Sequence, residues 1–559
     1  MTALLAVGFG TLLVRLISLQ IVHAEELSEK AERQHEKGMV LEAERGTIYD
    51  RRGRILATTV EVPSLYAMPP LMGNPRAAAA ELSRVLDVDR LTIQKRLKNG
   101  KDFVWLERKM NPALAQSVRQ LGLEGVGFLS ESQRFYPKRY LLGHILGFAG
   151  LDNQGLEGIE LKYNSYLKGE KGFLIVERDA AGRPIFPKGL GSIAPSRGKD
   201  LILTIDEVIQ HIAERELDAV MQKTTAVSGS VIVMDPKTGE ILAMAVRPVF
   251  NPNRVKRHDP EHWRNRTITD PYEPGSTFKI VAAAAALQEK VVAPQDLIDC
   301  ENGAMEIEGR VIHDHEKHGQ LTFAEVIQKS SNIGTVKIAM QLGEETLYRY
   351  IRAFGFGEKT GIDLIGEAPG LVREPTRWSG RSLASIAIGQ EVAMPPIQLI
   401  TAYSAIANGG FLMRPYLVSE IREPDGTLVT QFTPEARRQA IRPETARQLV
   451  KILEGTVAPG GTGGEAALAG FAVAGKTGTA QRVDPKPRLY SARDFVSSFV
   501  GFVPSNEPRI AILVVVDSPQ GIAWGGSVAA PVFKRIAEQT LGYLGVRPSS
   551  QEQLLLVAR

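Results

Sequence analysis

Three stretches of the chain have hydrophobic patterns that predict an element directly. Residues 3–22 form an apolar run interrupted by Arg15, and at about 1.5 Å per residue a helix of this length is one bilayer thick. Residues 280–287 are apolar and alanine-rich and follow a Pro-Gly pair and Ser276. This order predicts a buried helix with that serine at its N-terminus. Residues 25–42 are charged and amphipathic, which predicts a stalk.

Arg15 leaves the nature of the first apolar run open. A charge at mid-bilayer costs about 2.5–3.5 kcal/mol, and no Lys or Arg precedes the run, so the positive-inside signal is missing. Either the natural start lies upstream and Arg15 is near the outer end of a span, or Arg15 pairs with a partner helix. The alternative is a signal peptide cleaved near residues 22–24. We favour an uncleaved anchor over residues 1–23.

The second half of the chain has β-type runs near both of its ends. A strand is expected over 201–206, followed by a helix through Met221. Further strands are expected over 230–234, 240–244, 499–503 and 510–516, with a closing helix from about 529. These positions predict one sheet built from both ends of a domain, with a helical lobe inserted between them.

The first half reads as mostly β or extended. Residues 45–57 contain two short β-rich runs around a polar, Gly-containing turn, which predicts a hairpin. Residues 182–198 are rich in Gly, Pro and Ser, which predicts a linker to the second half.

Composition limits the possible functions. A chain of 559 residues suggests three or four domains, and a net charge of +4 gives no reason to expect a nucleic-acid partner. The single cysteine, Cys300, excludes an intrachain disulfide and a thiolate metal cluster. We expect no cofactor.

The most informative chemical feature is a serine and a lysine one helical turn apart. Ser276 and Lys279 share a face of the predicted helix, whose N-terminal N–H groups favour developing negative charge. A hydroxyl and an amine placed in this way form a nucleophile with its own base. The pattern alone is weak, because Ser165 and Lys168 repeat it.

Two motifs later in the chain distinguish the copy at Ser276 from the copy at Ser165. Ser330-Ser331-Asn332 follows a helix capped by Thr322-x-x-Glu325, and Asn332 is expected to cap the next helix, over 333–342. Lys476-Thr477-Gly478-Thr479 lies in a strand of small residues. The Lys-Thr-Gly at 237–239 precedes the serine and sits at a tight Asp-Pro turn, so we interpret it as a hairpin tip.

The ordered triple Ser-x-x-Lys, Ser-x-Asn, Lys-Thr-Gly is that of the penicillin-recognising acyl-serine enzymes. The chain resembles a class B penicillin-binding protein, a peptidoglycan D,D-transpeptidase, over nearly its whole length. The hairpin, the Arg-Phe-Tyr-Pro run at 134–137 and residues 153–160 resemble the pedestal of that family.

The resemblance implies an α+β multidomain fold. Its parts are a transmembrane anchor over 1–23, a non-catalytic, dimerisation-type pedestal domain, mostly β or extended, over 24–197, a transpeptidase domain over 198–545 and a C-terminal tail over 546–559. The transpeptidase domain would have the acyl-serine transferase architecture, an antiparallel sheet flanked by helices plus a helical lobe.

The resemblance also implies catalytic roles. Ser276 would attack the carbonyl between two D-alanines of a stem peptide, after a neutral Lys279 takes its proton. The pKa of Lys279 must then lie well below about 10.4, and burial and the charge of Lys476 would both lower it. Ser330 would relay a proton to the leaving D-alanine, and the amide of Asn332 would bond Lys279 and the substrate backbone.

The Lys-Thr-Gly strand would bind the substrate. Thr477 and Thr479 would hydrogen-bond the terminal carboxylate together with Lys476. Gly478 would let the peptide lie against the strand edge as an added strand. The resemblance gives the oxyanion hole to the backbone N–H groups of Ser276 and Thr479.

Alternatives remain at this stage. A β-lactamase would share the acylation, but no Glu-x-x-Leu-Asn run is present, and a penicillin sensor would not need all of these groups intact. The His-rich run at 313–318 suggests a metal site, but its spacing matches no recognised helical zinc motif, and we expect no metal.

The resemblance implies a cellular setting as well. Asn332 is typical of division and sporulation types, whereas many elongation types resemble Ser-x-Asp, so a septal role is expected and an elongation role is the alternative. Expected partners are peptidoglycan stem peptides, β-lactams as covalent inhibitors, a membrane-embedded lipid II polymerase and other divisome proteins. The expected location is the cytoplasmic membrane, single-pass with the N-terminus inside and the catalytic domain periplasmic.

Overall fold

The computed structural model describes residues 2–23, 36–100, 103–178, 184–185, 194–483 and 490–548. The chain forms two compact units. Unit 1 comprises 1–46, 59–133 and 165–199, and unit 2 comprises 47–58, 134–164 and 200–559. Most of the linker expected over 182–198 and of the tail expected over 546–559 lies outside the described residues.

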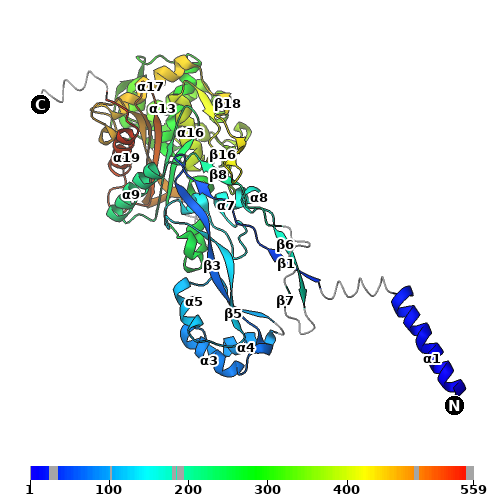
Figure 1. The fold of residues 1–559 in the computed structure, drawn as a ribbon. Helices are drawn as coiled ribbons and strands as arrows, with labels where there is room; N and C mark the ends of the chain where they lie inside the picture. The colour runs from blue at the N-terminus through cyan, green and yellow to red at the C-terminus, as the bar shows by residue number, and fades with distance from the viewer. Residues whose placement is uncertain are drawn as a thin grey trace. The chain divides into compact units, whose positions relative to one another are not determined.

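The N-terminal run is helical. It comprises α1 (Thr2–Ile17) and a π-helical turn, η1 (Ser18–Val22) (Figure 1). Among the residues that the structure describes, no helix combines the length and the apolar character needed to cross a membrane. The anchor over residues 1–23 therefore stays a prediction.

Unit 1 contains more helix than the sequence predicted. β3 (Ile55–Ala67) belongs to unit 1 from residue 59 onward. It pairs with β4 (Val104–Glu107) and β5 (Val126–Phe135). Three helices pack against these strands: α3 (Pro75–Leu86), α4 (Arg90–Asn99) and α5 (Pro112–Arg119). The expectation of a mostly β or extended pedestal is therefore wrong.

Local sequence explains these helices. Asn74, Asp89 and Asn111 each cap one of them by accepting a hydrogen bond from a backbone N–H of the first turn. The helices bury residues such as Leu82, Ile93 and Val118 in one apolar core with the strands. A separate three-stranded sheet pairs β1 (Glu36–Leu41) with β6 (Gly172–Arg178), and β6 with β7 (Pro184–Ile185), so the end of the expected stalk is a strand.

Unit 2 is built on a five-stranded sheet in the order β10 (Ile241–Arg247), β9 (Ser228–Met234), β21 (Ile510–Asp517), β20 (Tyr490–Val503) and β19 (Ala474–Val483). All neighbouring strands are antiparallel. The expected sheet built from both ends of the domain is confirmed, except that the strand expected over 201–206 belongs to a different sheet. β19, which carries the Lys-Thr-Gly motif, is an edge strand.

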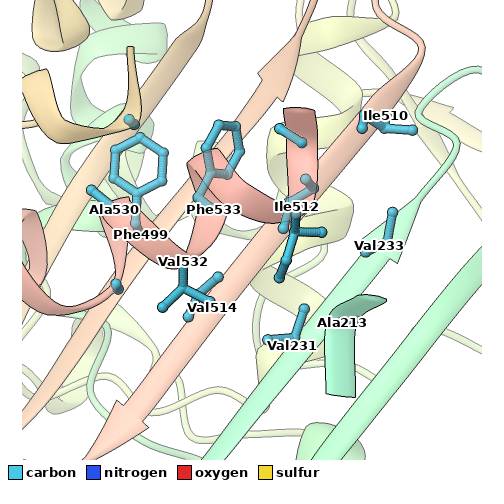
Figure 2. Packing of buried hydrophobic residues seen from close by; sticks show 14 of the residues in the cluster. Ala213, Val231, Val233, Phe499, Ile510, Ile512, Val514, Ala530, Val532 and Phe533 are labelled. Carbon is cyan, nitrogen blue, oxygen red and sulfur yellow. The ribbon is translucent and has the colours of Figure 1, made fainter. Parts of the chain in front are cut away.

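Side chains alternate between the two faces of this sheet. Val231 and Val233 lie in the core formed with α9 (Glu207–Thr224) and α19 (Ala530–Tyr543). Figure 2 shows Phe533 of α19 beside Phe499 of the sheet, and their ring centres are 4.8 Å apart. On the opposite face, Met234 contacts Ser404 of α16 (Pro396–Ala407). Helices therefore cover both faces.

The helical lobe lies between β10 and β19 in the sequence. Its helices are α11 (Lys279–Gln288), α12 (Phe323–Gln328), α13 (Asn332–Leu342), α14 (Glu344–Ala353), α15 (Ser382–Ala387), α16 and α17 (Pro443–Val457). Two small sheets pair β11 (Leu297–Asp299) with β14 (Gln320–Thr322), and β12 (Ala304–Ile307) with β13 (Arg310–His313). The predicted capping box at Thr322 and Glu325 is confirmed.

The predicted hairpin at 45–57 is confirmed. β2 (Ile48–Tyr49) pairs antiparallel with the start of β3, and Asp50 closes the turn by accepting from the N–H groups of Arg52 and Arg54. Within unit 2, β2 also pairs parallel with β8 (Asp200–Leu203). The same sheet continues through β16 (Val418–Arg422) to β17 (Leu428–Gln431), and β15 (Phe411–Met413) pairs separately with β18 (Ala436–Gln439).

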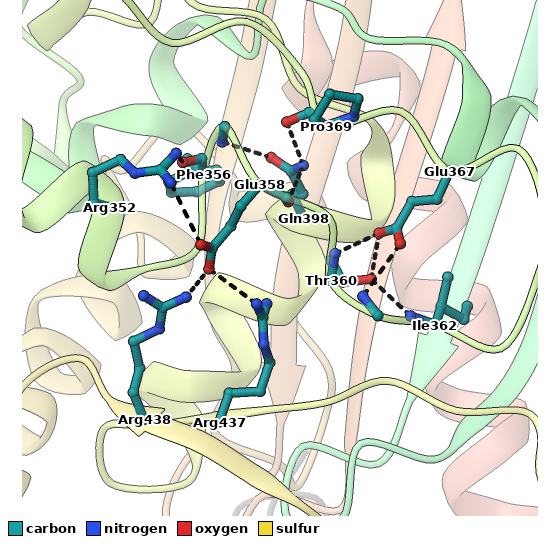
Figure 3. Close-up of polar contacts among 12 residues, drawn as sticks. Arg352, Phe356, Glu358, Thr360, Ile362, Glu367, Pro369, Gln398, Arg437 and Arg438 are labelled. Carbon is teal, nitrogen blue, oxygen red and sulfur yellow. Dashed lines mark hydrogen bonds and ion pairs between the residues drawn. The ribbon is translucent and has the colours of Figure 1, made fainter. Parts of the chain in front are cut away.

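Charged contacts hold the long segment between α14 and α15 (Figure 3). Glu358 forms ion pairs with Arg352, Arg437 and Arg438. Further along, Glu367 accepts from the backbone and the hydroxyl of Thr360. These ion pairs connect the segment to β18 and to the end of α14.

Candidate active site

Ser276 lies in a tight turn directly ahead of α11, as predicted. Residues 275–278 form a 3-10 turn that begins at Gly275, where φ is +55°. Thr277 donates its hydroxyl hydrogen to the Pro274 carbonyl at 2.8 Å and accepts from the Tyr403 hydroxyl at its own carbonyl at 2.9 Å. A side chain at Gly389 would clash with the Gly275 backbone, 2.1 Å away. Ser276 is therefore held half-buried on a rigid turn.

Lys279 is fully buried, and acceptors surround its amine. Nζ donates to the Ser330 carbonyl at 2.6 Å and to Oδ1 of Asn332 at 2.8 Å. Burial lowers the pKa of Lys279 to about 7, although the charge of Asp314 opposes the shift. A neutral amine has two hydrogens, which these two oxygens accept, so its lone pair stays available to accept a proton.

Ser330 Oγ lies between the two lysines. Lys476 Nζ donates to it at 2.9 Å, and Lys279 Nζ is 3.3 Å away. Ser330 has φ of +62°, in the left-handed region, where a non-glycine residue is uncommon and marks a turn that its surroundings must hold. The turn between two helices that was predicted for this motif is confirmed.

Lys476 is also fully buried, on edge strand β19. Burial, and then the positive charge of Lys279, hold the pKa of Lys476 well below its usual range. Like-charge repulsion across Ser330 therefore opposes full protonation of both amines together. An anion bound at Lys476 would favour the ammonium form of Lys476, because its negative charge would offset the repulsion between the two amines.

The prediction that Asn332 caps α13 is wrong. Ser331 is the N-cap, and its hydroxyl accepts from the N–H of Gly334 at 3.0 Å, while Asn332 is the first helical residue. The Asn332 side chain is engaged elsewhere, because Nδ2 donates to the His313 carbonyl at 2.7 Å while Oδ1 accepts from Lys279. The expected contact between the amide and Lys279 is present, whereas its contact with a substrate backbone stays a prediction.

Asp314 is a site residue that the sequence did not reveal. Its carboxylate accepts from the backbone N–H groups of Asn332 at 2.5 Å and Ile333 at 3.1 Å, and from the Ser331 hydroxyl at 2.6 Å. Its negative charge therefore offsets the partial positive charge at the N-terminus of α13. The only signal was an acidic residue in the His-rich run, which had suggested a metal instead.

The rest of the His-rich run is not gathered around a common point. His315 stacks against Trp524, with ring centres 4.1 Å apart. In the described part of the chain, no three His, Cys, Asp or Glu side chains are grouped closely enough to hold a metal ion.

Close packing around Gly478 leaves no room for a side chain, which the sequence did not predict. A Cβ there would lie 2.4 Å from Ser498 Oγ, 2.9 Å from Thr277 Cγ2 and 3.1 Å from the Pro274 carbonyl oxygen. The missing side chain thus lets β19 pack against the serine turn. Access for a substrate at the strand edge stays a prediction.

The two threonines of the motif have partners of their own. The Thr477 hydroxyl shares a hydrogen bond with that of Thr462 at 2.8 Å, and Thr479 Oγ1 accepts from the Gly525 N–H at 3.0 Å. A hydroxyl that accepts one bond can still donate its own hydrogen. Thr479 can therefore donate to an anion.

Two copies of the motifs lie elsewhere. Lys237 is on the turn between β9 and β10, and its amine lies 3.8 Å from a carboxylate oxygen of Glu507, with both side chains exposed. Ser165 and Lys168 are both exposed.

Comparison with known proteins agrees with this geometry. Residues 229–538 match the penicillin binding protein transpeptidase domain, and residues 40–203 match the penicillin-binding protein dimerisation domain. The chain belongs to the class B penicillin-binding proteins.

Individual members of the penicillin-binding protein family are similar over nearly the full chain. Stage V sporulation protein D of Bacillus subtilis is 38% identical over 96% of this chain and 84% of its own length. Peptidoglycan D,D-transpeptidase FtsI of Escherichia coli is 34% identical over 98% of this chain and 91% of its own. The crystal structure of penicillin binding protein 3 from Mycobacterium tuberculosis in complex with aztreonam has a TM-score of 0.72 at 27% identity, covering 92% of this chain and 99% of that one.

Proposed function

We propose that this chain is a serine-type D-Ala-D-Ala transpeptidase that cross-links peptidoglycan stem peptides during septal wall synthesis. The observation that carries the proposal is the position of Ser330 Oγ, 2.9 Å from the Lys476 amine and 3.3 Å from the Lys279 amine, next to the turn that holds Ser276. Names of relatives such as peptidoglycan D,D-transpeptidase support it.

Acylation begins at Ser276. Its Oγ attacks the carbonyl between the two D-alanines while its proton passes to the lone pair of Lys279. The tetrahedral oxyanion is bound by the N–H groups of Ser276 and Thr479. The C–N bond then breaks, and the departing D-alanine amine takes a proton delivered through Ser330. An acyl-enzyme ester remains.

Substrate orientation comes from β19. Lys476, Thr477 and Thr479 bind the terminal carboxylate, and its negative charge raises the pKa of Lys476, so that Lys476 is cationic while Lys279 stays neutral. Asn332 donates to the substrate backbone. The amine of a neighbouring stem peptide then attacks the ester carbonyl and loses a proton to Lys279. The ester C–O bond breaks, Ser276 Oγ takes that proton, and the new amide bond is the cross-link.

The cellular setting belongs to the same proposal. Residues 1–23 anchor the chain in the cytoplasmic membrane with the catalytic domain periplasmic, and 24–197, 198–545 and 546–559 are pedestal, transpeptidase domain and tail. A lipid II polymerase and other divisome proteins are the partners, and β-lactams are covalent inhibitors. Asn332, as typical of division and sporulation types, supports the septal role.

Depletion tests the proposal. Cells that lose the protein should form filaments, and the wild-type gene should restore division whereas Ser276→Ala should not. Rounded cells would indicate the elongation role instead. Restoration by Ser276→Ala would indicate a sensor, and rapid release of hydrolysed penicillin by the purified protein would indicate a β-lactamase.

A further inference from the structure

A cavity of about 270 Å³ lies directly beyond Asn332. Asn332 and Gln481 of β19 line it together with two arginines, Arg310 and Arg381. The remaining lining residues are mostly apolar or neutral: Ile307, Val311, Ile312, His313, Ala384, Ser385, Ile388 and Gln390. The cavity therefore shares Asn332 with the catalytic site, and no step described above uses its other lining residues.

The charged side chains that line this cavity are two arginines. Arg310 lies at the start of β13 and Arg381 directly precedes α15, and both are exposed. Among the residues that the structure describes, no Asp or Glu lines the cavity. Glu308 lies beside Gly380, but among the described residues neither arginine has an ion-pair partner within 4.0 Å. Two exposed guanidinium groups that line one cavity favour a carboxylate.

The position along β19 relates the cavity to the substrate. A peptide added to this edge strand with its terminal carboxylate at Lys476 runs antiparallel to β19, towards Gln481. Gln481 is two residues beyond Thr479, about 7 Å along the strand and on the same face. The residue that precedes the two D-alanines would therefore lie at the mouth of the cavity.

We propose that this cavity binds a free carboxylate of the donor stem peptide, located upstream of the D-Ala-D-Ala unit, with Arg310 and Arg381 as its counter-charges. This inference rests on the proposed function. Two sources have the required chemistry. One is the side-chain carboxylate of a diamino dicarboxylic acid directly before the D-alanines, and the other is the α-carboxylate of a γ-linked D-glutamate one residue earlier.

Competition against fluorescent penicillin tests the proposal on the full chain. Four synthetic D-Ala-D-Ala peptides are compared: one with both carboxylates free, two with one amidated, and the diamide. The free peptide should slow acylation by penicillin at a concentration roughly tenfold or more below that of the diamide. If a singly amidated peptide needs the same high concentration as the diamide, the carboxylate that is amidated in it is the one that the cavity binds.

Matched variants locate the effect. Arg310→Gln and Arg381→Gln should each remove most of the advantage of the free peptide, whereas Arg377→Gln, an exposed arginine outside the cavity, should keep it. Labelling by penicillin itself should be unchanged in Arg377→Gln, and in each variant the competition is measured against that variant's own labelling rate without peptide. Equal competition by the free peptide and the diamide, or an advantage that survives both substitutions, overturns this proposal alone. Absence of any Ser276-dependent labelling overturns the proposed function.

Discussion

The amine of Lys279 and the amide oxygen of Asn332 lie 2.8 Å apart, so the first residue of α13 orients the first residue of α11. Because Asn332 is neutral, this contact positions the amine without adding a charge that would favour the ammonium form. Burial then dominates, and the pKa of Lys279 is about 7. Because of this burial, about half of the Lys279 amine is neutral at pH 7.

Replacing Asn332 by aspartate should shift the pH dependence of acylation upward. Lys279 accepts a proton only in its neutral form, so the wild-type acylation rate should fall about tenfold per pH unit below about 7. A carboxylate at position 332 stabilises the ammonium form and raises the pKa of Lys279. The rate of penicillin acylation between pH 5.5 and 9 measures this. Asn332→Ala is the control, and an aspartate variant whose midpoint does not rise would contradict the assignment of Lys279 as the base.

Asp314→Asn should weaken the start of α13. Two backbone N–H groups and the Ser331 hydroxyl lose a charged acceptor, which should lower the free energy of unfolding by about 1–2 kcal/mol. At pH 9, where Lys279 is neutral with or without the charge of Asp314, acylation should slow because the backbone N–H of Asn332 loses its acceptor. Urea unfolding and acylation rates measure the two effects. Glu316→Gln, two residues away and exposed, is the matched control, and equal behaviour of the two variants would remove Asp314 from the site.

Gly478→Ala should displace β19 from the serine turn. The added methyl group would lie 2.9 Å from Thr277 Cγ2 and 3.1 Å from the Pro274 carbonyl oxygen. The backbone at Pro274 cannot move away from this methyl group without also moving Ser276. Overpacking of this kind costs about 1–3 kcal/mol, and penicillin acylation should drop at least tenfold. Gly464→Ala, where nothing lies within 4 Å, should leave stability and acylation unchanged. Normal acylation by Gly478→Ala would show that the strand has room.

The elements with strong local signals were predictable, whereas contacts between distant segments were not. The capping box at Thr322, the buried helix after Ser276 and the strand at Lys476 follow from spacing and composition. Asp314 was missed because its partners lie 17 to 19 residues further along the chain, and no local pattern records that contact. The pedestal helices were missed although Asn74, Asp89 and Asn111 are ordinary N-cap residues followed by helix formers.

His144 should make unit 2 less stable in acid. Burial lowers the pKa of His144 to about 4, and its Nε2 contacts the His262 carbonyl oxygen at 2.9 Å. Between pH 6.5 and about 4 the unfolded histidine binds a proton that the folded one does not, so stability falls as pH falls through this range. The loss can reach about 3 kcal/mol. Urea unfolding of wild type and His144→Gln at pH 7.5 and 5 measures it, and an equal pH dependence in both would contradict the prediction.

The site of covalent modification by penicillin tests the central assignment most directly. After incubation of the full chain with penicillin, mass spectrometry of its peptides should show one adduct, on Ser276, and none in Ser276→Ala. Ser165→Ala, at an exposed copy of the Ser-x-x-Lys pattern, should be modified like wild type. An adduct that persists in Ser276→Ala, or that maps to Ser165, would contradict Ser276 as the nucleophile.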